Sequence, residues 1–389
     1  MNRLASLTFA VAVGAFAATS ALAQDKVKVG LLVTLSGPSA ALGQQARNGF
    51  ELALKDLGGK LGGREAEVIV VDDELKPDVA VTKVKGLIER DKVDFVVGPI
   101  FSNVLGAIVK PVTDAQTFLI SPNAGSSALA GKSCNAFYFA TSYQNDQVHQ
   151  VSGNVAQARG HKKAYLLAPN YQAGKDALAG FKRDFKGEVL EESYVPLNTL
   201  DFQSELAKIA SMKPDAIYTF MPGGMGVNLV KQYKQAGLTI PVFSAFTVDE
   251  ATLPAQGEAA LGMFAGSNWA PNLDTPQNKK FVDSYVAAHN AVPATYAFQA
   301  YDAALLIDSA VKAVNGDLSN KDAVRKAMLK ADFASLRGPF KFSANGYPIQ
   351  NFYLTKVGKR ADGKYETQIV EKVFSDYADP YAKDCALTN

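Results

Sequence analysis

The sequence predicts an α/β fold with two lobes, each a parallel sheet flanked by helices. Short apolar runs alternate with segments of helical periodicity, first between residues 27 and 125 and again after residue 163. Buried parallel strands read as continuous apolar runs, because crossover helices cover both faces of their sheet. Two such series, separated by a polar stretch at residues 144–146, predict two lobes with a cleft between them.

The first residues have the pattern of a secretory signal peptide. Arg3 supplies a basic start, residues 4–21 are almost without polarity, and residues 21–24 read Ala-Leu-Ala-Gln. A short apolar core before an Ala-x-Ala site is typical of a cleaved export signal. A transmembrane helix is the alternative, but the run is rich in Ala and the cleavage site is well formed. We therefore expect residues 1–23 to be removed and the mature chain to be a soluble periplasmic protein.

The charge balance and the cysteines bear on the possible partners and on the compartment of the protein. The chain has 40 basic and 38 acidic residues, so it lacks the strongly basic character of nucleic-acid-binding proteins. Its two cysteines are Cys134 and Cys385. In an oxidising compartment such a pair favours a disulfide, with two free thiols as the alternative.

The first series begins at an apolar strand and ends in a βαβ unit. The expected strands are residues 27–33, 68–71, 94–97 and 117–121. The expected helices are residues 42–57, 80–88 and 104–114, with Asp78 as the cap of the second. Residues 134–143 break the alternation, and residues 144–146 mark the first crossing between the lobes.

The second series repeats the alternation and then changes character. Its expected strands are residues 164–167, 188–195, 216–220 and 241–245, with helices at 175–185, 202–210 and 227–236. Three further helices are expected at residues 277–290, 295–315 and 322–331, the last with a capping box at 319–322. Residues 340–342, 352–354 and 367–373 alternate like antiparallel strands, with turns at Asn345-Gly346 and Asp362-Gly363.

Small polar residues follow two neighbouring strands of the first series. Ser102 and Asn103 follow the strand at 94–97, whereas Ser121, Asn123 and Gly125 end the strand at 117–121. Ligands of open α/β sheets bind just beyond such strand ends. Hydroxyls and free N–H groups at a helix N-terminus suit an anion, most simply a carboxylate. The alternative is that Ser102 and Asn103 only cap the helix.

Aromatic residues recur at the junctions between strands and helices. They are Phe101, Tyr143, Tyr171, Phe246 and Trp269. Small-molecule pockets are mostly apolar, with a few placed polar groups. Any one of these residues could serve core packing, but five at such positions favour a binding cleft.

The sequence lacks the motifs of nucleotide binding and nucleophilic catalysis. Residues 125–133 resemble a phosphate-binding loop, but five residues separate Gly125 from Gly131 where that motif has four. There is no Gly-x-Ser-x-Gly nucleophile elbow. His149, His161 and His289 lie far apart without metal-ligand spacing, and we expect surface positions for them. The sequence therefore predicts no cofactor and no metal.

An acidic run at residues 72–74 follows the expected second strand. Asp72 and Asp73 could support a hydrolase or a cation site. We expect a solvated loop instead, because no acid–base pair with helical or loop support accompanies them.

Taken together, these features resemble a known family. The chain looks like the periplasmic solute-binding proteins of ABC importers, in the leucine/isoleucine/valine-binding class. The matching motifs lie at residues 29–43, 97–102, 121–125, 281–285 and 301–303, and the resemblance covers the whole mature chain. It implies two Rossmann-like lobes that are joined by three crossings and close on a ligand like a hinge. Such a protein is not an enzyme and hands its ligand to a membrane permease.

The resemblance also assigns roles to the loops that follow the strands. Ser102 matches the serine that holds the ligand carboxylate through its hydroxyl and amide. Asn123, with Ala124 beside it, matches the position whose backbone carbonyl meets the ligand ammonium group. Gly125 matches a threonine that gives a second hydroxyl and amide, so only the amide can remain here, and Ser126 is the candidate substitute for the hydroxyl.

The second lobe matches the family less completely. Leu42 corresponds to an apolar residue of the cleft wall and Tyr171 to a tyrosine of the second lobe. Met221 begins the stretch where another cleft tyrosine is usual. Thr247 falls near the acid that pairs with the ligand amino group, and a small loop shift could bring Asp249 there.

The missing acid bears on the ligand. A buried ammonium group needs a carboxylate or several other acceptors. We therefore expect an aromatic acid of the benzoate or hydroxycinnamate type, whose ring could face Tyr143, Phe246 and Trp269. A branched-chain or other apolar amino acid is the alternative.

These interpretations combine into one prediction. Residues 24–143 with 271–335 form one lobe, and residues 144–270 with 336–389 form the other. We expect a monomer that binds a small carboxylate and delivers it to ABC permease subunits, without nucleic acid. An exported hydrolase and a signalling receptor are the alternatives. The lack of an acid–base pair argues against the first, and the lack of a transmembrane segment argues against the second.

Overall fold

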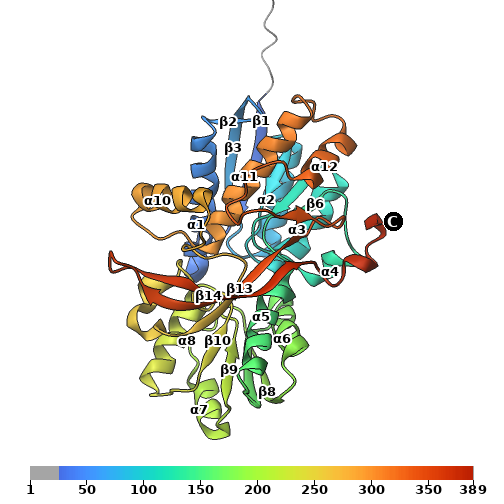
Figure 1. Ribbon diagram of the computed structural model, residues 1–389. Helices are drawn as coiled ribbons and strands as arrows, with labels where there is room; N and C mark the ends of the chain where they lie inside the picture. Colours follow the sequence, from blue (N-terminus) through green and yellow to red (C-terminus); the bar gives the residue numbers. More distant parts are fainter. Residues whose placement is uncertain (1–25, 389) are drawn as a thin grey trace, which may run out of the picture.

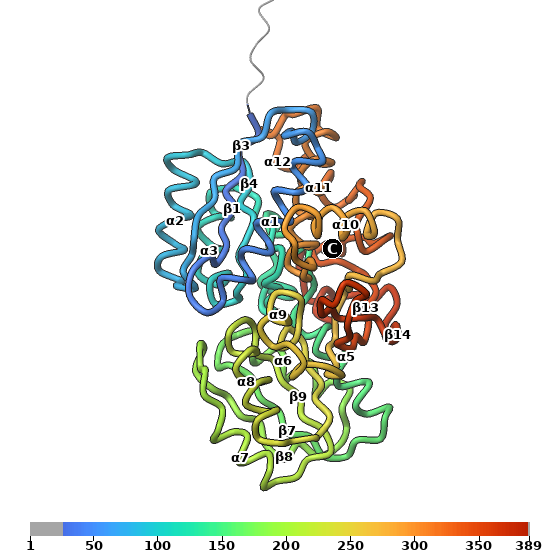
Figure 2. Tube along the Cα trace, turned by 90° about the vertical axis from the view of Figure 1, so that its left-hand side faces the viewer, coloured from blue at the N-terminus to red at the C-terminus, as the bar shows by residue number. Residues whose placement is uncertain are grey.

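The computed structural model describes residues 26–388, which form two α/β lobes one above the other (Figure 1). The predicted signal peptide, residues 1–23, lies outside this range. We call the half built on the six-stranded sheet the first lobe and the half built on the eight-stranded sheet the second lobe. Figure 2 shows the two halves from the side, with residues from both ends of the chain in the upper one. The predicted fold class is confirmed.

The first sheet is mostly parallel. Its strands, in spatial order, are β2 (Lys60–Leu61), β3 (Arg64–Asp72), β1 (Val27–Val33), β4 (Phe95–Val97), β5 (Phe118–Ser121) and β6 (Tyr138–Ala140). Only the β2–β3 pair is antiparallel. The strands of the inner part, β1, β4 and β5, are almost entirely buried, as their continuous apolar runs predict.

Helices from both ends of the chain cover the first sheet. They are α1 (Ala40–Asp56), α2 (Pro77–Glu89), α3 (Ser102–Asp114), the short α4 (Ser127–Ala130), α10 (Pro276–His289), α11 (Thr295–Ala313) and α12 (Lys321–Lys330). Helix α1 packs against α11, and α2 against α3. The N-cap of α2 is Lys76 rather than Asp78, because Pro77 occupies the start of the helix and Asp78 falls in its first turn. Asn320 caps α12 through its side chain.

The second sheet has the order β12-β13-β11-β10-β9-β7-β8, with β14 paired to β13. The parallel strands are β7 (Lys163–Pro169), β8 (Glu188–Val195), β9 (Ala216–Thr219), β10 (Val242–Ser244) and β11 (Phe264–Ser267). The antiparallel strands are β12 (Lys341–Phe342), β13 (Pro348–Lys359) and β14 (Tyr365–Tyr377). Its helices are α5 (Asn145–Ala158), α6 (Gln172–Asp184), α7 (Gln203–Met212), α8 (Gly224–Gln235) and α9 (Leu253–Gln256).

Six strands and α-helices were not expected from the sequence: β2, α4, β6, α5, α9 and β11. Helix α5 begins in the polar stretch at residues 144–146 and continues to Ala158. Its apolar stripe is thin, yet Asn145, Gln147 and Ser152 are buried, and their side chains form hydrogen bonds with neighbouring elements. Helical periodicity is judged by apolar residues, so a helix buried through polar contacts escapes it.

The chain passes between the sheets after β6, after β11 and before β12. A buried arginine, Arg337, links these passages. Its guanidinium donates hydrogen bonds to the carbonyl oxygens of Thr141 and Ser142 and to the side-chain oxygen of Gln350. It also pairs with Asp302 at 3.2 Å. Because breaking a buried ion pair is costly, this cluster holds the crossing segments in one arrangement. The lobe boundaries at residues 143, 270 and 335 stay predictions.

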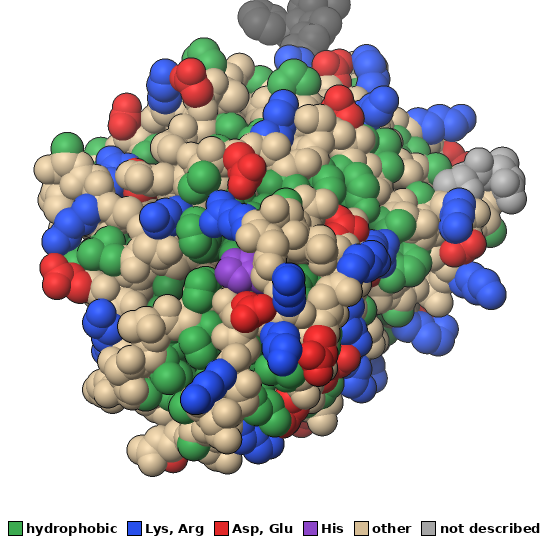
Figure 3. Space-filling view, turned by 60° about the horizontal axis from the view of Figure 1, so that its bottom comes forward, with side chains coloured by type: hydrophobic (Ala, Val, Ile, Leu, Met, Phe, Trp, Pro, Cys, Tyr) green, Lys and Arg blue, Asp and Glu red, His purple; other side chains and the backbone are tan. Residues whose placement is uncertain are grey.

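The predicted disulfide between Cys134 and Cys385 is confirmed, with Cα atoms 5.6 Å apart. It joins the C-terminal segment, which follows β14, to the loop between α4 and β6 in the first lobe. No helix within residues 26–388 is long and apolar enough to cross a membrane. On the face in Figure 3, basic and acidic side chains are interspersed, in keeping with the nearly balanced charge of the chain.

Candidate ligand-binding site

A cavity lies between the lobes, at the carboxyl ends of the parallel strands of both sheets. It is lined by Leu42, Ile100, Phe101, Ser102, Asn123, Ala124, Tyr143, Asn145, His149, Tyr171, Ala173, Phe220, Pro222, Phe246 and Tyr296. Most of these follow directly on β4, β5, β6, β7, β9 or β10. The free volume is about 20 Å³, room for about one water molecule. A ring-sized ligand therefore requires the walls to separate.

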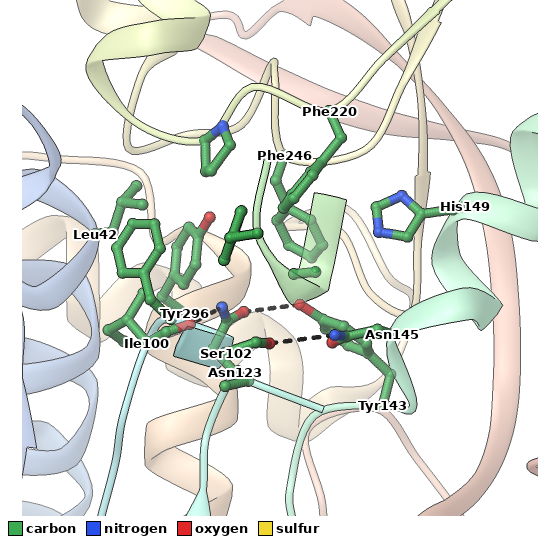
Figure 4. A pocket seen from close by; sticks show the side chains of 15 residues that line it. Leu42, Ile100, Ser102, Asn123, Tyr143, Asn145, His149, Phe220, Phe246 and Tyr296 are labelled. Atoms are coloured by element: carbon green, nitrogen blue, oxygen red, sulfur yellow. Dashed lines mark hydrogen bonds between the residues drawn. The ribbon is translucent and has the colours of Figure 1, made fainter. Parts of the chain in front are cut away.

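Eight of the residues predicted for the site line this cavity: Leu42, Phe101, Ser102, Asn123, Ala124, Tyr143, Tyr171 and Phe246. Figure 4 shows how they lie, with Ser102 and Asn123 on one side and Phe246 on the other. They come from six separate segments of the chain. The tertiary structure brings them together because parallel strands present their carboxyl ends at one edge of a sheet.

Trp269 was predicted to face the ligand and does not line the cavity. Its indole is fully buried and stacks on Phe298, with ring centroids 4.9 Å apart. The indole N–H donates to the side-chain oxygen of Asn278 at 2.7 Å. Trp269 follows β11, where the chain returns to the first lobe, so its ring packs against α10 and α11 instead.

Gly125 also differs from expectation. Its N–H donates to the side-chain oxygen of Asn145 at 3.0 Å, and its carbonyl accepts from the Asn145 N–H at 2.7 Å. A Cβ atom here would lie 1.8 Å from the carbonyl oxygen of Tyr143, so no side chain fits. The amide predicted to hold the carboxylate is therefore already engaged, and Gly125 serves the close approach of two loops.

Met221 and Asp249 lie behind the cavity wall. Met221 is buried in the apolar core of the second lobe, and its neighbour Pro222 reaches the cavity instead. Asp249 accepts from the N–H groups of Ala251 and Thr252, and it faces the Tyr296 hydroxyl. Burial raises the pKa of Asp249 to about 7, and the hydrogen bonds from Ala251, Thr252 and Tyr296 lower this pKa by less than burial raises it. The loop therefore holds this acid away from the cavity.

Ser102 is the first residue of α3, and Phe101 occupies the N-cap position. The Ser102 side chain makes no capping bond, so the alternative role as a helix cap is not observed. Its oxygen accepts a hydrogen bond from the side-chain amide of Asn145 at 3.2 Å. The hydroxyl proton is thus left to donate, and the first N–H groups of α3 have no partner inside the helix.

The two lobes are joined next to Ser102 by a buried polar network. Asp176 on α6 accepts from the Ser127 hydroxyl at 2.6 Å and from the Asn145 amide at 2.9 Å. Gln172 donates to the same carboxylate at 2.8 Å. Ser127 begins α4, directly after the loop that carries Asn123, whereas Asp176 belongs to the second lobe. This network therefore connects the two lobes beside the cavity.

Aromatic rings form most of the remaining wall. Tyr143 stacks on Phe246 at 5.4 Å between centroids, and Tyr171 stacks on Phe220 at 6.2 Å. Phe246 has a φ of 57°, a left-handed conformation that is rare for a bulky residue. Such conformations persist where surrounding contacts hold them, often at ligand sites. The Tyr143 hydroxyl donates to the side-chain oxygen of Asn123 at 2.9 Å, which braces the loop after β5.

Seven lining residues were missed: Ile100, Asn145, His149, Ala173, Phe220, Pro222 and Tyr296. Phe220 ends an expected strand, so the junction rule used for the other aromatic residues could have found it. Asn145 and His149 are one turn apart on α5, a helix that was not predicted. His149 is 2% exposed rather than on the surface, and burial lowers its pKa to about 3. Tyr296 carried no signal in the sequence.

The acidic run at residues 72–74 lies in a turn after β3, and its carboxylates bind neighbouring backbone and side-chain groups. The Asp72 carboxylate accepts from the N–H groups of Leu35 and Glu74. Asp73 is fully buried and accepts from the Thr34 hydroxyl at 2.7 Å. The expected solvated loop is therefore only partly correct, because Asp73 is inside. Within residues 26–388, no three His, Cys, Asp or Glu side chains come together so as to hold a metal ion.

Two lobes with a cavity rich in aromatic side chains between them are typical of a binding protein, and comparison with known proteins agrees. The family described as periplasmic binding protein matches residues 26–364. The chain therefore belongs to the periplasmic binding protein family, and it is a solute-binding component of an ABC transporter, not an enzyme. This confirms the resemblance to the leucine/isoleucine/valine-binding class.

Among its relatives, Leu/Ile/Val-binding protein homolog 6 of Brucella melitensis is 30% identical over 96% of this chain and 98% of its own length. A solute-binding protein from R. palustris in complex with benzoate is 37% identical, with a TM-score of 0.88 over 93% of this chain and 100% of that one. Another from Rhodopseudomonas palustris, in complex with 3,4-dihydroxybenzoic acid, is 31% identical, with a TM-score of 0.84 over 91% and 99%.

Proposed function

We propose that this protein captures an aromatic carboxylate in the periplasm, after export by its signal peptide, and delivers it to an ABC permease. The observation that carries the proposal is the composition of the cavity wall. Rings of Tyr143, Tyr171, Phe220 and Phe246 line it, and none of its lining residues in the described part of the chain carries a carboxylate.

The absence of a lining carboxylate discriminates between ligand classes. An α-amino acid brings an ammonium group, whose burial is costly unless an anion or several acceptors surround it. Two buried acids lie just outside the lining: Asp176 is engaged by Ser127, Asn145 and Gln172, whereas Asp249 lies behind Phe246 and has a raised pKa that leaves it partly protonated at neutral pH. An aromatic acid needs no such partner, and its ring fits the aromatic wall.

The carboxylate of the ligand has a matching anchor in the first lobe. We place it against the Ser102 hydroxyl and the first N–H groups of α3, where the helix dipole favours a negative charge. The Ser102 oxygen already accepts from Asn145, so its proton is available to the ligand. Asn123 and Ala124 form the neighbouring loop wall.

Closure of the lobes completes the proposed mechanism. Residues 24–143 with 271–335 would move against residues 144–270 with 336–389, and the closed form would gain the hydrogen bonds between Ser127 and Asp176. The similarity to two proteins solved with benzoate and dihydroxybenzoate supports the aromatic ligand. The names of the curated relatives favour a branched-chain amino acid, which remains the second candidate.

A thermal-shift screen of the mature protein separates these candidates. Benzoate, 4-hydroxybenzoate, 4-hydroxycinnamate, leucine and isoleucine would each be tested over a range of concentrations. A ligand present at a hundred times its dissociation constant stabilises the native state by about 2.7 kcal/mol. We expect the aromatic acids to raise the melting temperature and the amino acids to leave it unchanged. The reverse result would contradict the proposal.

A further inference from the structure

One lining residue has an unassigned polar atom that faces the cavity. His149 lies in the second turn of α5, at the end of the cavity away from Leu42 and Ile100 (Figure 4). Its ring meets Phe220 edge to face at 5.0 Å, and the side chain is buried. The carboxylate anchor at Ser102 does not involve it.

The partner of His149 fixes its tautomer. The Tyr218 hydroxyl, on β9, forms a hydrogen bond with Nδ1 of His149. Tyr218 is fully buried, and its ring stacks on Phe181 at 4.5 Å. Nδ1 is the one hydrogen-bond partner of this hydroxyl among the described residues. A buried hydroxyl proton without an acceptor is costly, so the Tyr218 O–H donates to Nδ1. A neutral imidazole with an accepting Nδ1 carries its proton on Nε2.

Burial keeps this imidazole neutral, since its pKa is lowered to about 3. His149 thus presents a neutral N–H donor, Nε2–H, with no protein acceptor among residues 26–388. Phe220 and Phe246 stand beside it and offer none. A donor fixed in an apolar wall favours a ligand that brings an acceptor there and disfavours one that does not.

The position of His149 relative to the anchor indicates which part of the ligand it meets. Asn145, which bonds to Ser102, precedes His149 by one helical turn on α5. Side chains so spaced lie on one face of a helix, with Cβ atoms about 5–6 Å apart. Asn145 thus stands between Ser102 and His149 along the cavity wall (Figure 4), so a ligand whose carboxylate is held at Ser102 meets His149 with a part of its ring remote from the carboxylate.

We propose that His149 is a specificity-determining residue, whose Nε2–H donates a hydrogen bond to an oxygen on the ring of the ligand, opposite its carboxylate. The preferred ligands are then ring-hydroxylated aromatic acids rather than unsubstituted or alkylated ones. Tyr218 is the positioning residue that holds the required tautomer. This inference rests on the proposed function, because it presumes an aromatic carboxylate anchored at Ser102.

Calorimetric titration with benzoate, 4-hydroxybenzoate and 4-methylbenzoate tests the inference. In the wild type, 4-hydroxybenzoate should bind about tenfold or more tightly than 4-methylbenzoate, which has a similar shape but no acceptor. His149→Leu removes the donor, so this affinity ratio should fall toward one. His149→Gln places an amide near the position of Nε2 and should retain part of the preference.

Tyr218→Phe keeps His149 but removes the hydroxyl that fixes its tautomer, so the affinity ratio of 4-hydroxybenzoate to 4-methylbenzoate should fall by a smaller factor. If circular dichroism shows that His149→Leu does not fold, Tyr218→Phe still tests the inference. An equal loss of affinity for all three acids in the His149 variants would overturn the inference, because His149 would then bind the carboxylate. So would a wild type that does not distinguish 4-hydroxybenzoate from 4-methylbenzoate.

The proposed function fails in a different way. If none of the three acids binds to the wild type, the aromatic-carboxylate proposal is wrong. If all three bind and the ratio is the same in wild type and His149→Leu, the inference about His149 alone is wrong.

Discussion

The two walls of the cavity differ in chemistry. The first-lobe wall presents the Ser102 hydroxyl and the loop of Asn123 among apolar side chains such as Leu42, Ile100 and Phe101. The second-lobe wall presents the rings of Tyr171, Phe220 and Phe246 beside Asn145 and His149. A hydroxyl at a helix N-terminus can fix the orientation of a carboxylate, whereas aromatic rings stabilise a bound ring only once closure has removed it from water. The difference suggests that affinity for the carboxylate resides in the first lobe and discrimination between ligands in the second.

The largest expected effect is a dependence of stability on pH, caused by Asp249 and Glu250 behind the second-lobe wall. Burial raises the pKa of Asp249 to about 7 and that of Glu250 to about 8. In the unfolded chain both groups ionise near pH 4. The folded protein therefore binds more protons than the unfolded one above that pH, and its stability falls as the pH rises through the raised pKa values.

Buried His149 makes the stability rise with pH, because its pKa is lowered in the folded protein, but this effect ends near its unfolded pKa of about 6.5. Between pH 6.5 and 8 we expect Asp249 and Glu250 to dominate, so that the free energy of unfolding falls by roughly 2–3 kcal/mol. Denaturant unfolding at several pH values measures this. The double variant Asp249→Asn with Glu250→Gln should flatten the slope. A wild type whose stability is constant or rises over this interval would refute the prediction.

The next effect tests the first wall. Ser102→Ala removes a hydrogen bond to the charged ligand, which typically costs about 1.5–3 kcal/mol, or roughly ten- to a hundredfold in affinity. Titration calorimetry with benzoate measures the loss. Ser204→Ala, at an exposed serine of α7, is a matched control and should bind as the wild type does. Unaltered affinity in Ser102→Ala would mean that the carboxylate is held elsewhere.

A smaller effect is expected where the walls meet. Asp176→Asn weakens the acceptor of the Ser127 hydroxyl, a hydrogen bond between the lobes that we propose forms on closure. We expect affinity to fall roughly threefold to tenfold, since a net hydrogen bond contributes about 1 kcal/mol. Small-angle scattering should also show that the variant needs more ligand to reach the smaller radius of gyration. Asp184→Asn changes a carboxylate of the same helix whose partners, Gln150 and Asn154, lie in the second lobe, and it is the control. If both variants bind the ligand with the same affinity, the hydrogen bond between Ser127 and Asp176 does not stabilise the closed form.

The smallest effect is the most informative about the ligand. Asp249→Asn should change the affinity for an aromatic acid by less than about twofold, because this side chain lies behind the wall and meets no charge on such a ligand. For a bound amino acid, the same variant would remove a carboxylate available to the ammonium group and weaken binding strongly. Calorimetry with benzoate and leucine distinguishes the two outcomes.

The polar residues after the first-lobe strands were easier to predict than the cavity residues of the second lobe. Ser102 and Asn123 follow apolar strands in a pattern that local sequence shows directly. Helix α5 was missed because its buried face includes Asn145 and His149, which look like surface residues until their partners are known. Trp269 was assigned to the cavity by the same junction rule that succeeded for Phe246. The rule cannot tell which way a ring turns where the chain changes lobes.

By itself, the sequence determined the alternation of strands and helices, the two-lobe class, the export pattern, the pairing of the two cysteines and the place of Ser102 at the cavity. These depend on local periodicity, composition and the geometry common to parallel sheets. Only the tertiary structure decided that Asp249 lies behind the wall, that Gly125 has no free amide, and that His149 faces the cavity with its tautomer fixed by Tyr218. Each of these depends on contacts between residues far apart in the chain, and no local pattern encodes such contacts.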